Sequence, residues 1–414
     1  MTRNNIVQKN IPQGWQEKSL GSFLSISKGK LPKKTYEVSD ENSVPYLSIK
    51  HLDGNESKYA HKSDGVIADK NDLLVVADGS GSGRMYRGYY GLVSSTFLKI
   101  STQSPNEISN DYLEVLFSYL DFTNSRFRKG GAIPHFDFKQ LKDVTILLPP
   151  IKEQQKIAEI LGAVDEDIAK TQGVIEATEK LKRGLMQQLF TRGIGHTKFK
   201  ETKIGQIPEE WKIGGFKNLV NPDDKNAIKP GPFGSALKKS FYVEKGFKIY
   251  GQEQVISGDA FYGDYYINDE KYKELEGFKV NAGDILISLV GTIGKILIVP
   301  EDFEKGIINP RLLKITPDKT KADSRFIAHL LKSDFLIQQM SQKSHGGTMN
   351  ILNKGMLMGV GFGVPPLKEQ KEIAEILSAV DEKISVNRKL KAKLILLKKG
   401  LMQDLLSGRV RVNS

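Results

Sequence analysis

The feature that most constrains this chain is a long segment that is written twice. Residues 149–190 align without a gap to residues 365–406, an offset of 216 residues, and more than half of the aligned positions are identical. Both copies open on Pro-Pro-x-Lys-Glu-Gln and close on Gly-Leu-Met-Gln, at 184–187 and 400–403. Self-similarity of this length predicts a chain built from two related halves.

Each repeated segment is predicted to be one long helix. A Pro-Pro pair suits a helix entrance, and about forty residues without an internal proline follow it. Apolar residues then recur at steps of three, four or seven, which makes a coiled-coil-like stripe. At ~1.5 Å per residue each helix would reach roughly 60 Å, so we expect a spacer. The stripe residues expected to pack helix on helix or to dock a partner are Ile157, Leu161, Val164, Ile168, Leu185, Leu189, Ile373, Leu377, Val380, Ile384, Leu401 and Leu405.

Polar residues interrupt the apolar stripe in both copies. They are Thr171 and Thr178 in the first helix and Asn387 in the second. A polar residue in such a seam can fix the register of two helices at some cost in stability. The alternative interpretation is a solvated irregularity, and the sequence leaves both open.

Two similar but unequal heads precede the helices. Each opens on Ile-Pro-x-x-Trp, ending at Trp15 and Trp211, and each carries a Gly-Gly pair before its helix. Inside the heads, short apolar runs broken by glycine predict strands. A strand that starts at an aspartate and feeds a glycine-rich turn occurs once per head, at 72–83 and at 284–294. The predicted fold class is α+β, with β-rich mixed domains over 1–148 and 196–364 and spacer helices over 149–195 and 365–414.

Composition narrows the function less than the repeat does. The net charge of +12 favours a polyanionic partner, but the excess is spread thinly over the four segments. Absence of cysteine excludes disulfides, zinc-cysteine sites and thiol nucleophiles, and fits a reducing cytosol. Residues 1–13 have no apolar signal core, and the most apolar stretch, 285–299, is too short for a bilayer. We therefore expect a cytoplasmic protein with no membrane partner.

No catalytic constellation emerges from the motifs. The glycine turns at 79–84 and 291–295 do not follow Gly-x-x-x-x-Gly-Lys-Ser/Thr, so ATP binding is not expected. Neither Asn221-Pro222 nor Asn309-Pro310 continues into the second proline and aromatic that an amino-methyltransferase needs for a flipped base. The aspartates over 64–78 fit turn chemistry at least as well as a metal site. We assign no catalytic residue and no metal ligand.

The borders and helices resemble the specificity subunits of Type I restriction-modification systems. The paired Ile-Pro-x-x-Trp openings, the two Pro-Pro-x-x-Glu-Gln helices and Gly-Pro-Phe-Gly-Ser-Ala-Leu at 231–237 carry the resemblance, which spans nearly the whole chain. It implies two target-recognition domains on a pseudo-twofold frame, each reading half of a split site on double-stranded DNA, separated by two antiparallel helices. The helices would dock two modification subunits, and restriction subunits would join through them. The chain itself would be a non-catalytic subunit that binds no cofactor. S-adenosylmethionine, ATP and Mg would belong to the partners.

Candidate DNA contacts are polar and basic side chains in the glycine-bearing loops. Base edges take Arg, Lys, Asn, Gln, Ser and Thr, whereas phosphates take cations and backbone amides. For any one of these residues the alternative is a solvated surface side chain. For His135 or His345 the alternative is a histidine that caps a helix or packs in the core. In the first head the candidates are Lys28, Lys30, Lys33, Lys34, Lys50, His51, Ser80, Ser82, Arg84, Arg126, Arg128, Lys129 and His135. In the second head they are Lys229, Ser235, Lys238, Lys239, Gln252, Gln254, Thr292, Lys295, His345, Thr348 and Asn350.

Two functions from other classes remain as alternatives at this point. One is a self-contained DNA-modifying enzyme with a cryptic active site, and the other is a coiled-coil interaction protein without a DNA role. Binding of S-adenosylmethionine by the isolated chain would favour the first. Absence of sequence-specific duplex binding in the assembled complex would favour the second.

Overall fold

The computed structural model describes residues 11–121, 127–130, 134–292, 294–342 and 353–412. The chain divides into two compact units. Unit 1 comprises Met1–Thr171 with Leu390–Ser414, and unit 2 comprises Gln172–Lys389. Each unit therefore contains one head together with a stretch of both repeated helices.

The two repeated segments are single helices, as predicted. They are α4 (Ile151–Arg192) and α10 (Leu367–Leu406), 42 and 40 residues long. Within unit 2 they run antiparallel, because Glu179 pairs with Arg388 at 2.6 Å while Lys182, further along α4, pairs with the earlier Asp381 at 2.5 Å. The antiparallel arrangement implied by the family resemblance is thus present in the ion pairs of this unit.

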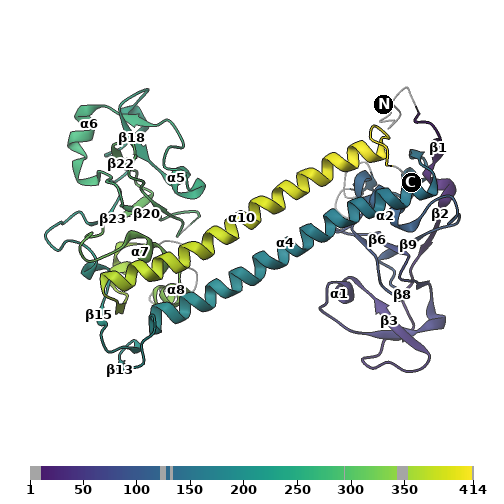
Figure 1. Cartoon of the computed structure of the whole chain (residues 1–414), viewed down its shortest axis with the longest axis horizontal. Coiled ribbons are helices and arrows are strands. Elements are labelled where there is room, and N and C mark those ends of the chain that lie inside the picture. The colour runs from purple at the N-terminus through teal and green to yellow at the C-terminus, as the bar shows by residue number, and fades with distance from the viewer. Residues whose placement is uncertain (1–10, 122–126, 131–133, 293, 343–352, 413–414) are drawn as a thin grey trace. The chain divides into compact units, whose positions relative to one another are not determined.

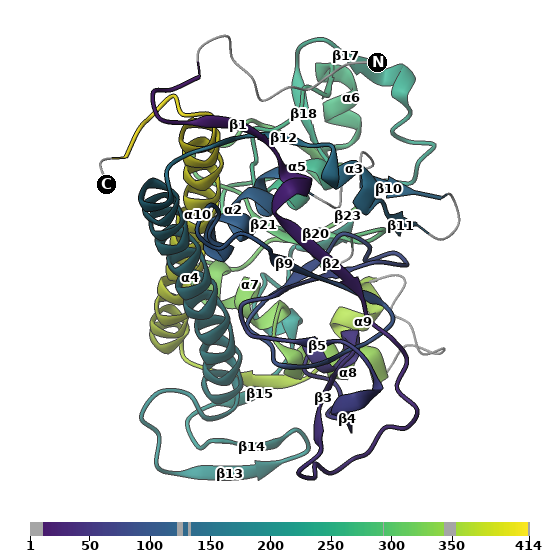
Figure 2. The same ribbon diagram turned by 90° about the vertical axis from the view of Figure 1, so that its right-hand side faces the viewer.

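Unit 1 contains two four-stranded sheets, a two-stranded border sheet and a small hairpin. The border sheet pairs the first and last strands of the head, which lie side by side in Figure 2. In sheet order, the strands are β2 (Leu24–Lys28), β9 (Phe97–Thr102), β6 (Leu73–Val76) and β7 (Met85–Tyr86); then β4 (Tyr59–His61), β3 (Ser43–Leu47), β8 (Gly91–Val93) and β5 (Ile67–Ala68); then β1 (Gln16–Ser19) with β12 (Thr145–Leu148); and β10 (Arg128–Lys129) with β11 (His135–Phe136). The helices of the head are α1 (Ile49–Leu52), α2 (Asn110–Leu120) and α3 (Phe138–Lys142).

Unit 2 repeats this plan with additions. Figure 1 shows α5 and α6 beside the sheet that holds β18 and β22. In sheet order, the strands are β16 (Ile228–Pro230), β23 (Leu312–Ile315), β20 (Ile285–Ser288) and β21 (Ile296–Ile298); then β17 (Tyr242–Val243), β19 (Tyr266–Ile267), β18 (Phe247–Tyr250) and β22 (Gly306–Ile308); then β15 (Lys212–Gly214) with β24 (Phe362–Val364); and the hairpin β13 (Phe199–Thr202) with β14 (Gly205–Pro208). Its helices are α5 (Gln252–Ser257), α6 (Asp269–Glu274), α7 (Ser324–Leu331), α8 (Asp334–Gln342) and α9 (Lys354–Met358).

The first four-stranded sheets of the two heads have the same strand order, whereas the second sheets differ, because the parallel pair is central in unit 1 and lies at an edge in unit 2. Each first sheet is antiparallel, and each second sheet contains one parallel pair, β3 with β8 and β18 with β22. Asp72 pairs with Lys99 at 3.3 Å and the equivalent Asp284 with Lys314 at 3.8 Å, across neighbouring strands. Both aspartates also accept a backbone amide of the preceding turn, at 2.8 Å. This is the structural role that turn chemistry predicted for Asp72. The α+β prediction is confirmed.

The cores explain why the apolar stripes of the helices are needed. In unit 1, Ile157 and Leu161 of α4 and Leu405 of α10 are buried among head residues such as Phe117 and Leu113. In unit 2, the stripe residues of α4 and α10 that lie in or against the core are Leu185, Leu189, Ile373 and Leu377, beside Met186, Phe190 and Ala374 of the same helices. Val164, Ile168, Val380 and Leu401 are half-buried, and Ile384 is buried.

The stripe residues that lie in these two cores therefore hold each head onto its helices. Val164, Ile168, Val380 and Ile384 belong to neither head core, so partner docking through the stripe stays a prediction. Thr171 and Thr178 are buried as well, but each hydroxyl donates to the carbonyl four residues earlier in its own helix, at 2.7 and 2.6 Å. Asn387 does the same, at 2.8 Å. Such local hydrogen bonds satisfy a polar group without a partner across the seam.

Candidate nucleic-acid interface

Each head is anchored to its helix by the two motifs that border it. In unit 1, Trp15 Nε1 donates to Glu153 Oε2 at 3.0 Å. In unit 2, Trp211 Nε1 donates to Glu369 Oε2 at 2.8 Å. The tryptophans come from Ile-Pro-x-x-Trp and the glutamates from Pro-Pro-x-Lys-Glu-Gln. The two motifs that recur in the sequence are thus two sides of one hydrogen-bonded corner, built once in each unit.

The neighbouring glutamine ties the same helix to the middle of the head. Gln154 Oε1 accepts the amide of Ser109 at 3.0 Å, and Gln370 Oε1 accepts the amide of Asp323 at 3.2 Å. Ser109 and Asp323 are the N-caps of α2 and α7. Because Gln154 and Gln370 are fully buried, their hydrogen bonds fix where the head helix starts. The head and its helix consequently form one rigid support for the loops.

The corner in unit 1 is closed by the segment that follows α10. Arg411 binds the Glu153 carboxylate twice, with Nε to Oε1 at 2.8 Å and Nη2 to Oε2 at 2.9 Å. Burial would raise the pKa of Glu153, but the hydrogen bonds from Arg411 and Trp15 outweigh it and hold the pKa below its ordinary value. Gly408 turns this segment at φ +70°, where an added Cβ would collide with Pro12.

The corner in unit 2 is closed by the segment that follows α4, with different donors. The amide of Ile194 and Nε2 of His196 both lie 2.9 Å from Glu369 Oε1. Gly193 turns the chain at φ +65°, where a Cβ would collide with Trp211 and Glu369. Sequence reasoning did not single out His196 or Arg411, because neither lies in the aligned repeat.

On this support, unit 1 carries a glycine-rich turn that gathers polar side chains from several segments. The turn follows β6, with Gly79 and Gly83 at φ +93° and +89°. Arg128 of β10 reaches it twice, with Nε to Ser82 Oγ at 2.8 Å and Nη2 to the carbonyl of Ser80 at 2.7 Å. The structure thereby brings together Ser80, Ser82 and Arg128, but Ser82 is 0% exposed, so we withdraw it as a DNA contact and assign it the role of holding Arg128.

Asp78, at the start of this turn, binds two further predicted residues. Its carboxylate lies 2.6 Å from His135 Nδ1 and 3.2 Å from Lys28 Nζ. Partial burial would raise the pKa of Asp78, but the hydrogen bonds from His135 and Lys28 lower it on balance. His135 and Lys28 are both exposed, so each keeps part of its hydrogen-bonding surface open beside the turn.

Arg84, where the turn ends, is positioned by a residue that sequence reasoning missed. Asp53 accepts Arg84 Nη2 at 2.9 Å and the Tyr86 hydroxyl at 3.0 Å. The guanidinium also lies over the Tyr86 ring, 4.8 Å from its centroid. An acidic residue 31 positions upstream gives no sequence signal for this contact. Arg84 itself is exposed.

The other predicted residues of unit 1 are less closely associated with the turn. Lys129 forms an ion pair with Asp137, and Lys30, Lys33, Lys34 and Lys50 are exposed. His51 is half-buried, and its amide is bound by the capping Ser48 hydroxyl. Arg126 lies outside the described residues.

Unit 2 has the equivalent turn after β20, with glycines 291 and 294 at φ +71° and +75°. The buried Ser288 braces it, since its hydroxyl accepts the amide of Lys295 at 3.0 Å and contacts the carbonyl of Thr292 at 2.5 Å. Gln252 of α5 donates to the carbonyl of Val290 at the start of the turn. The exposed Thr292 and Lys295 and the half-buried Gln252 therefore surround one loop.

Gln254 does not belong to this surface. Its side chain is 0% exposed, its Oε1 accepts the amide of Gly251 at 2.7 Å, and its Nε2 donates to the carbonyl of Tyr262 at 2.5 Å. Its hydrogen-bonding groups are thus used inside the domain, and we withdraw it as a DNA contact. This burial could not be predicted from the sequence, because Gln252 and Gln254 are the same residue type and lie on one short helix.

The remaining predicted residues of unit 2 make no contact with this turn that the described residues show. Lys229 Nζ donates to Asn226 Oδ1 at 2.6 Å and lies over the Phe278 ring, while Ser235, Lys238 and Lys239 are exposed. Phe233, in the same loop, is 89% exposed and was not singled out from the sequence. His345, Thr348 and Asn350 lie outside the described residues.

The arrangement of these side chains is better suited to binding a polyanion than to catalysing a reaction. Turns with left-handed glycines expose backbone amides, and cations stand beside them, which is how proteins contact phosphates. In the described residues no group of three metal-ligating side chains is present. None of the described helices is long and apolar enough to cross a membrane.

The comparisons with known proteins agree on one family. A family model described as "Type I restriction modification DNA specificity domain" matches residues 12–180 and 231–395. The MjaVIII specificity subunit of Methanocaldococcus jannaschii is 32% identical, covering 98% of this chain and 95% of the relative. The EcoBI specificity subunit of Escherichia coli is 24% identical, over 90% of this chain and 81% of the relative.

Solved structures show the same fold. The S subunit of a Type I restriction-modification system from M. genitalium superposes with a TM-score of 0.58 at 16% identity, covering 97% of this chain and 98% of that chain. A chain from a study of complex assembly and conformational transition of the Type I system gives 0.54 at 15% identity, covering 97% and 100%. Since the family model matches both halves and a 32% identical relative aligns over nearly the full length, the chain belongs to the family of Type I restriction-modification DNA specificity subunits.

Proposed function

We propose that each head of this chain binds one half of a split, asymmetric DNA site, and that the chain thereby directs a Type I complex to its target. The observation that carries the proposal is the glycine-rich turn found in both units after the equivalent strand, β6 or β20. Different side chains surround it in the two units, Arg128 and His135 in one and Gln252 and Lys295 in the other. Two similar domains that carry different side chains around the turn are suited to the recognition of two different half-sites.

The chemistry of these side chains suggests a division of roles. Arg84 and Lys28 in unit 1 and Lys295 in unit 2 are exposed cations beside backbone amides, which favours phosphate contacts. Arg128 and Gln252 are held by hydrogen bonds to the turns themselves, so both side chains are ordered beside the loops and have little side-chain entropy left to lose. Such ordered groups are suited to base edges in the major groove.

The long helices would set the spacing of the two half-sites and dock the partner subunits. Their continuity over 42 and 40 residues supports a rigid spacer. The proposed partners are two modification subunits and, through them, restriction subunits. Because the family description names a recognition domain and no reaction, methyl transfer from S-adenosylmethionine and ATP- and Mg-dependent cleavage would be carried out by those partners.

The test is sequence-specific binding by the complex of this chain with its modification subunits. Fluorescence anisotropy would compare wild type with Arg128→Ala on the target duplex and on a duplex of scrambled sequence. We expect Arg128→Ala to weaken target binding by tenfold or more and scrambled binding by much less. A matched control is Lys156→Ala, an exposed cation of α4 in the same unit. Equal losses for the two variants, or no preference of the wild type for any duplex, would contradict the proposal.

A further inference from the structure

Two apolar side chains stand almost fully in solvent at the same position of the two heads. Leu31 is 77% exposed and Phe233 is 89% exposed. Each lies on the loop that follows the edge strand of the first four-stranded sheet, which is β2 in unit 1 and β16 in unit 2. Neither residue lies in the corners or in the glycine-rich turns, so the roles assigned to those parts do not explain it.

The register of the sheets shows that the two positions are equivalent. Lys28 of β2 pairs with Leu98, and Pro230 of β16 pairs with Leu313. Leu98 and Leu313 occupy the same place opposite β6 and β20. The exposed apolar residue is the third residue after Lys28 and after Pro230. A single exposed apolar side chain is ordinary, but one at the same place in both heads requires a reason.

The backbone in front of each exposed side chain is fixed by the same close contact. A Cβ added to Gly29 would lie 2.1 Å from the carbonyl oxygen of Ser94, and one added to Gly231 would lie 1.8 Å from that of Asn309. Each glycine also donates its amide to a carbonyl of the neighbouring strand, at 3.0 and 2.8 Å. Only glycine fits so close to another backbone, so both loops leave the sheet along one defined path.

The backbone is also held beside the exposed side chains. In unit 1, Pro32 is buried, and the amide of Lys33 donates to Asp64 Oδ2 at 3.2 Å. In unit 2, Pro232 is buried, and the amide of Ala236 donates to the carbonyl of the exposed phenylalanine at 2.8 Å. Each loop therefore presents its apolar side chain outward from an ordered backbone, which reduces the entropy lost when the side chain is bound.

The charge of both loops favours a polyanion as the partner. Residues 28–36 and residues 225–243 each contain four lysines and no acidic residue. Lys30, Lys238 and Lys239 form no ion pair with any residue that the structure describes. An apolar side chain among free cations is the pattern of DNA-bending proteins, in which a Leu or Phe enters the base stack while cations bind the adjacent phosphates.

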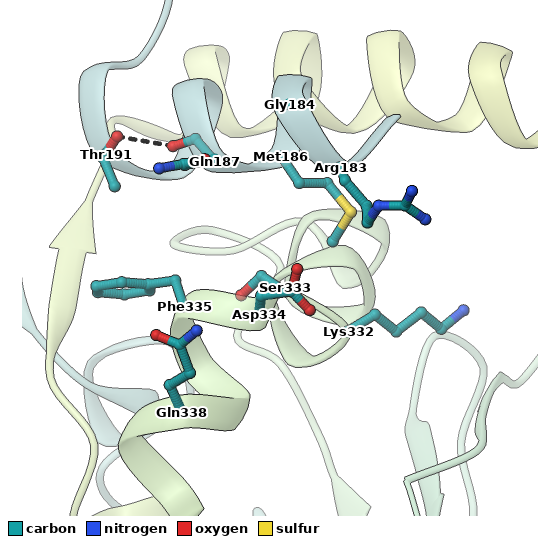
Figure 3. A pocket seen from close by; sticks show the side chains of 10 residues that line it. All are labelled: Arg183, Gly184, Met186, Gln187, Thr191, Lys332, Ser333, Asp334, Phe335 and Gln338. Carbon is teal, nitrogen blue, oxygen red and sulfur yellow. Dashed lines mark hydrogen bonds between the residues drawn. The ribbon is translucent and has the colours of Figure 1, made fainter. Parts of the chain in front are cut away.

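These loops are separate from the surface of the long helices. In unit 2, the groove beside α4 that Figure 3 shows is lined by residues between 183 and 191 and between 332 and 338, and by none of 225–243. The exposed phenylalanine therefore belongs to the head, the part of each unit that we propose to bind DNA.

We infer that Leu31 and Phe233 are DNA wedges, each of which inserts between two neighbouring base pairs of its half-site. The inference rests on the proposed function, and it names residues that deform the duplex in place of reading it. Insertion of such a side chain partly unstacks one base step and kinks the DNA. Because pyrimidine–purine steps unstack most easily, each half-site should carry such a step where the wedge enters.

The experiment uses the complex of the full chain with its modification subunits and target duplexes in which 2-aminopurine replaces one adenine at a time. The fluorescence of this base rises when it loses a stacked neighbour. We expect Leu31→Ser to abolish a rise in one half-site and Phe233→Ser to abolish a rise in the other, each with about tenfold weaker target binding. Leu31→Phe and Phe233→Leu should keep the rise, because each introduces the residue that the other unit uses.

The matched controls are Val38→Ser in unit 1 and Phe261→Ser in unit 2. Their side chains are 78% and 45% exposed, but acidic residues at 37 and 40 and at 259 and 264 flank them. Both controls should leave target binding and fluorescence unchanged. All of the substituted side chains are exposed, so the variants should fold, and urea unfolding checks this.

Three results would overturn the inference. Rises that all persist in Leu31→Ser and Phe233→Ser would come from bases extruded for methylation. Weaker assembly with the modification subunits and unchanged unstacking in these variants would make the loops a protein contact. If the wild-type complex prefers no duplex, the proposed function fails together with the inference, whereas specific binding with unchanged unstacking in the variants refutes the wedges alone.

Discussion

Substitution of Glu369 by alanine should destabilise unit 2 more than any other single change at its surface. The carboxylate accepts three donors, namely Trp211 Nε1 at 2.8 Å and the Ile194 amide and His196 Nε2 at 2.9 Å. Trp211 is 0% exposed, so its N–H would be left without an acceptor in the core. An orphaned buried donor costs about 1–3 kcal/mol, so the loss of the acceptor of Trp211, together with that of the half-buried Ile194 amide, leads us to expect a cost of about 3 kcal/mol.

The chain offers a direct assay, because it contains two tryptophans, one in each corner. In a Trp15→Phe background, the remaining indole reports on unit 2 alone. With a urea m-value of about 3 kcal/mol per molar, the unfolding midpoint followed by Trp211 emission should fall by about 1 M in Glu369→Ala.

The control is Glu372→Ala, which removes an exposed carboxylate one turn along α10 that pairs loosely with Lys368 at 4.0 Å. Exposed pairs of this kind contribute about 0–1 kcal/mol, so its midpoint should hardly move. If Glu369→Ala shifts the midpoint no more than Glu372→Ala does, the corner does not hold the head to its helix and the reasoning is refuted.

Three further predictions concern other parts of the chain. Burial, helped by the nearby charge of Lys182, lowers the pKa of His329 in the folded state to about 4. The folded state therefore favours the neutral imidazole. The stability that this gives is present above pH 6.5 and is lost as the pH falls toward 4. The free energies of unfolding from urea titrations at pH 7 and pH 4.5 should accordingly differ by roughly 2 kcal/mol more in wild type than in His329→Gln, and equal differences would contradict the burial argument. Leu161→Glu places a charge at a fully buried position and should cost more than about 4 kcal/mol by urea unfolding, with a cooperative wild-type-like transition as the contrary result. Insertion of one helical turn at equivalent positions in α4 and α10 should increase the number of base pairs between the two half-sites in sequences selected from random duplexes. An unchanged number would refute the proposal that the helices set this distance.

The large features of the fold could be predicted because they repeat. The ungapped offset, the proline-free segments and the apolar stripe define α4 and α10, and the Asp-strand-glycine pattern locates β6 and β20 with their turns. The border motifs were visible in the sequence, but their contact was not, because the pairing of Trp15 with Glu153 joins residues 138 positions apart. Nothing in a single sequence connects such distant residues.

The residues of the candidate site were predicted from their type and loop position, and their burial in the structure then showed which of them are accessible. Ser80, Arg128 and His135 come together because β10 and β11 fold back onto the turn, a long-range contact that local pattern cannot reveal. Gln254 was misplaced for the same reason, since its burial depends on what packs over α5. The apolar stripe was predicted from its spacing, but the packing of Ile157, Leu161 and Ile373 into the head cores was not, because that packing depends on contacts between distant parts of the chain.

The most direct test of the central claim is a map of DNA methylation in cells that express the modification subunit with and without this chain. We predict one split motif with two unlike halves that is methylated only when the chain is present. Replacing the glycine turn of unit 1, residues 79–83, should change one half of that motif and leave the other half unchanged. A continuous motif, methylation that persists without the chain, or a change in both halves would contradict the account.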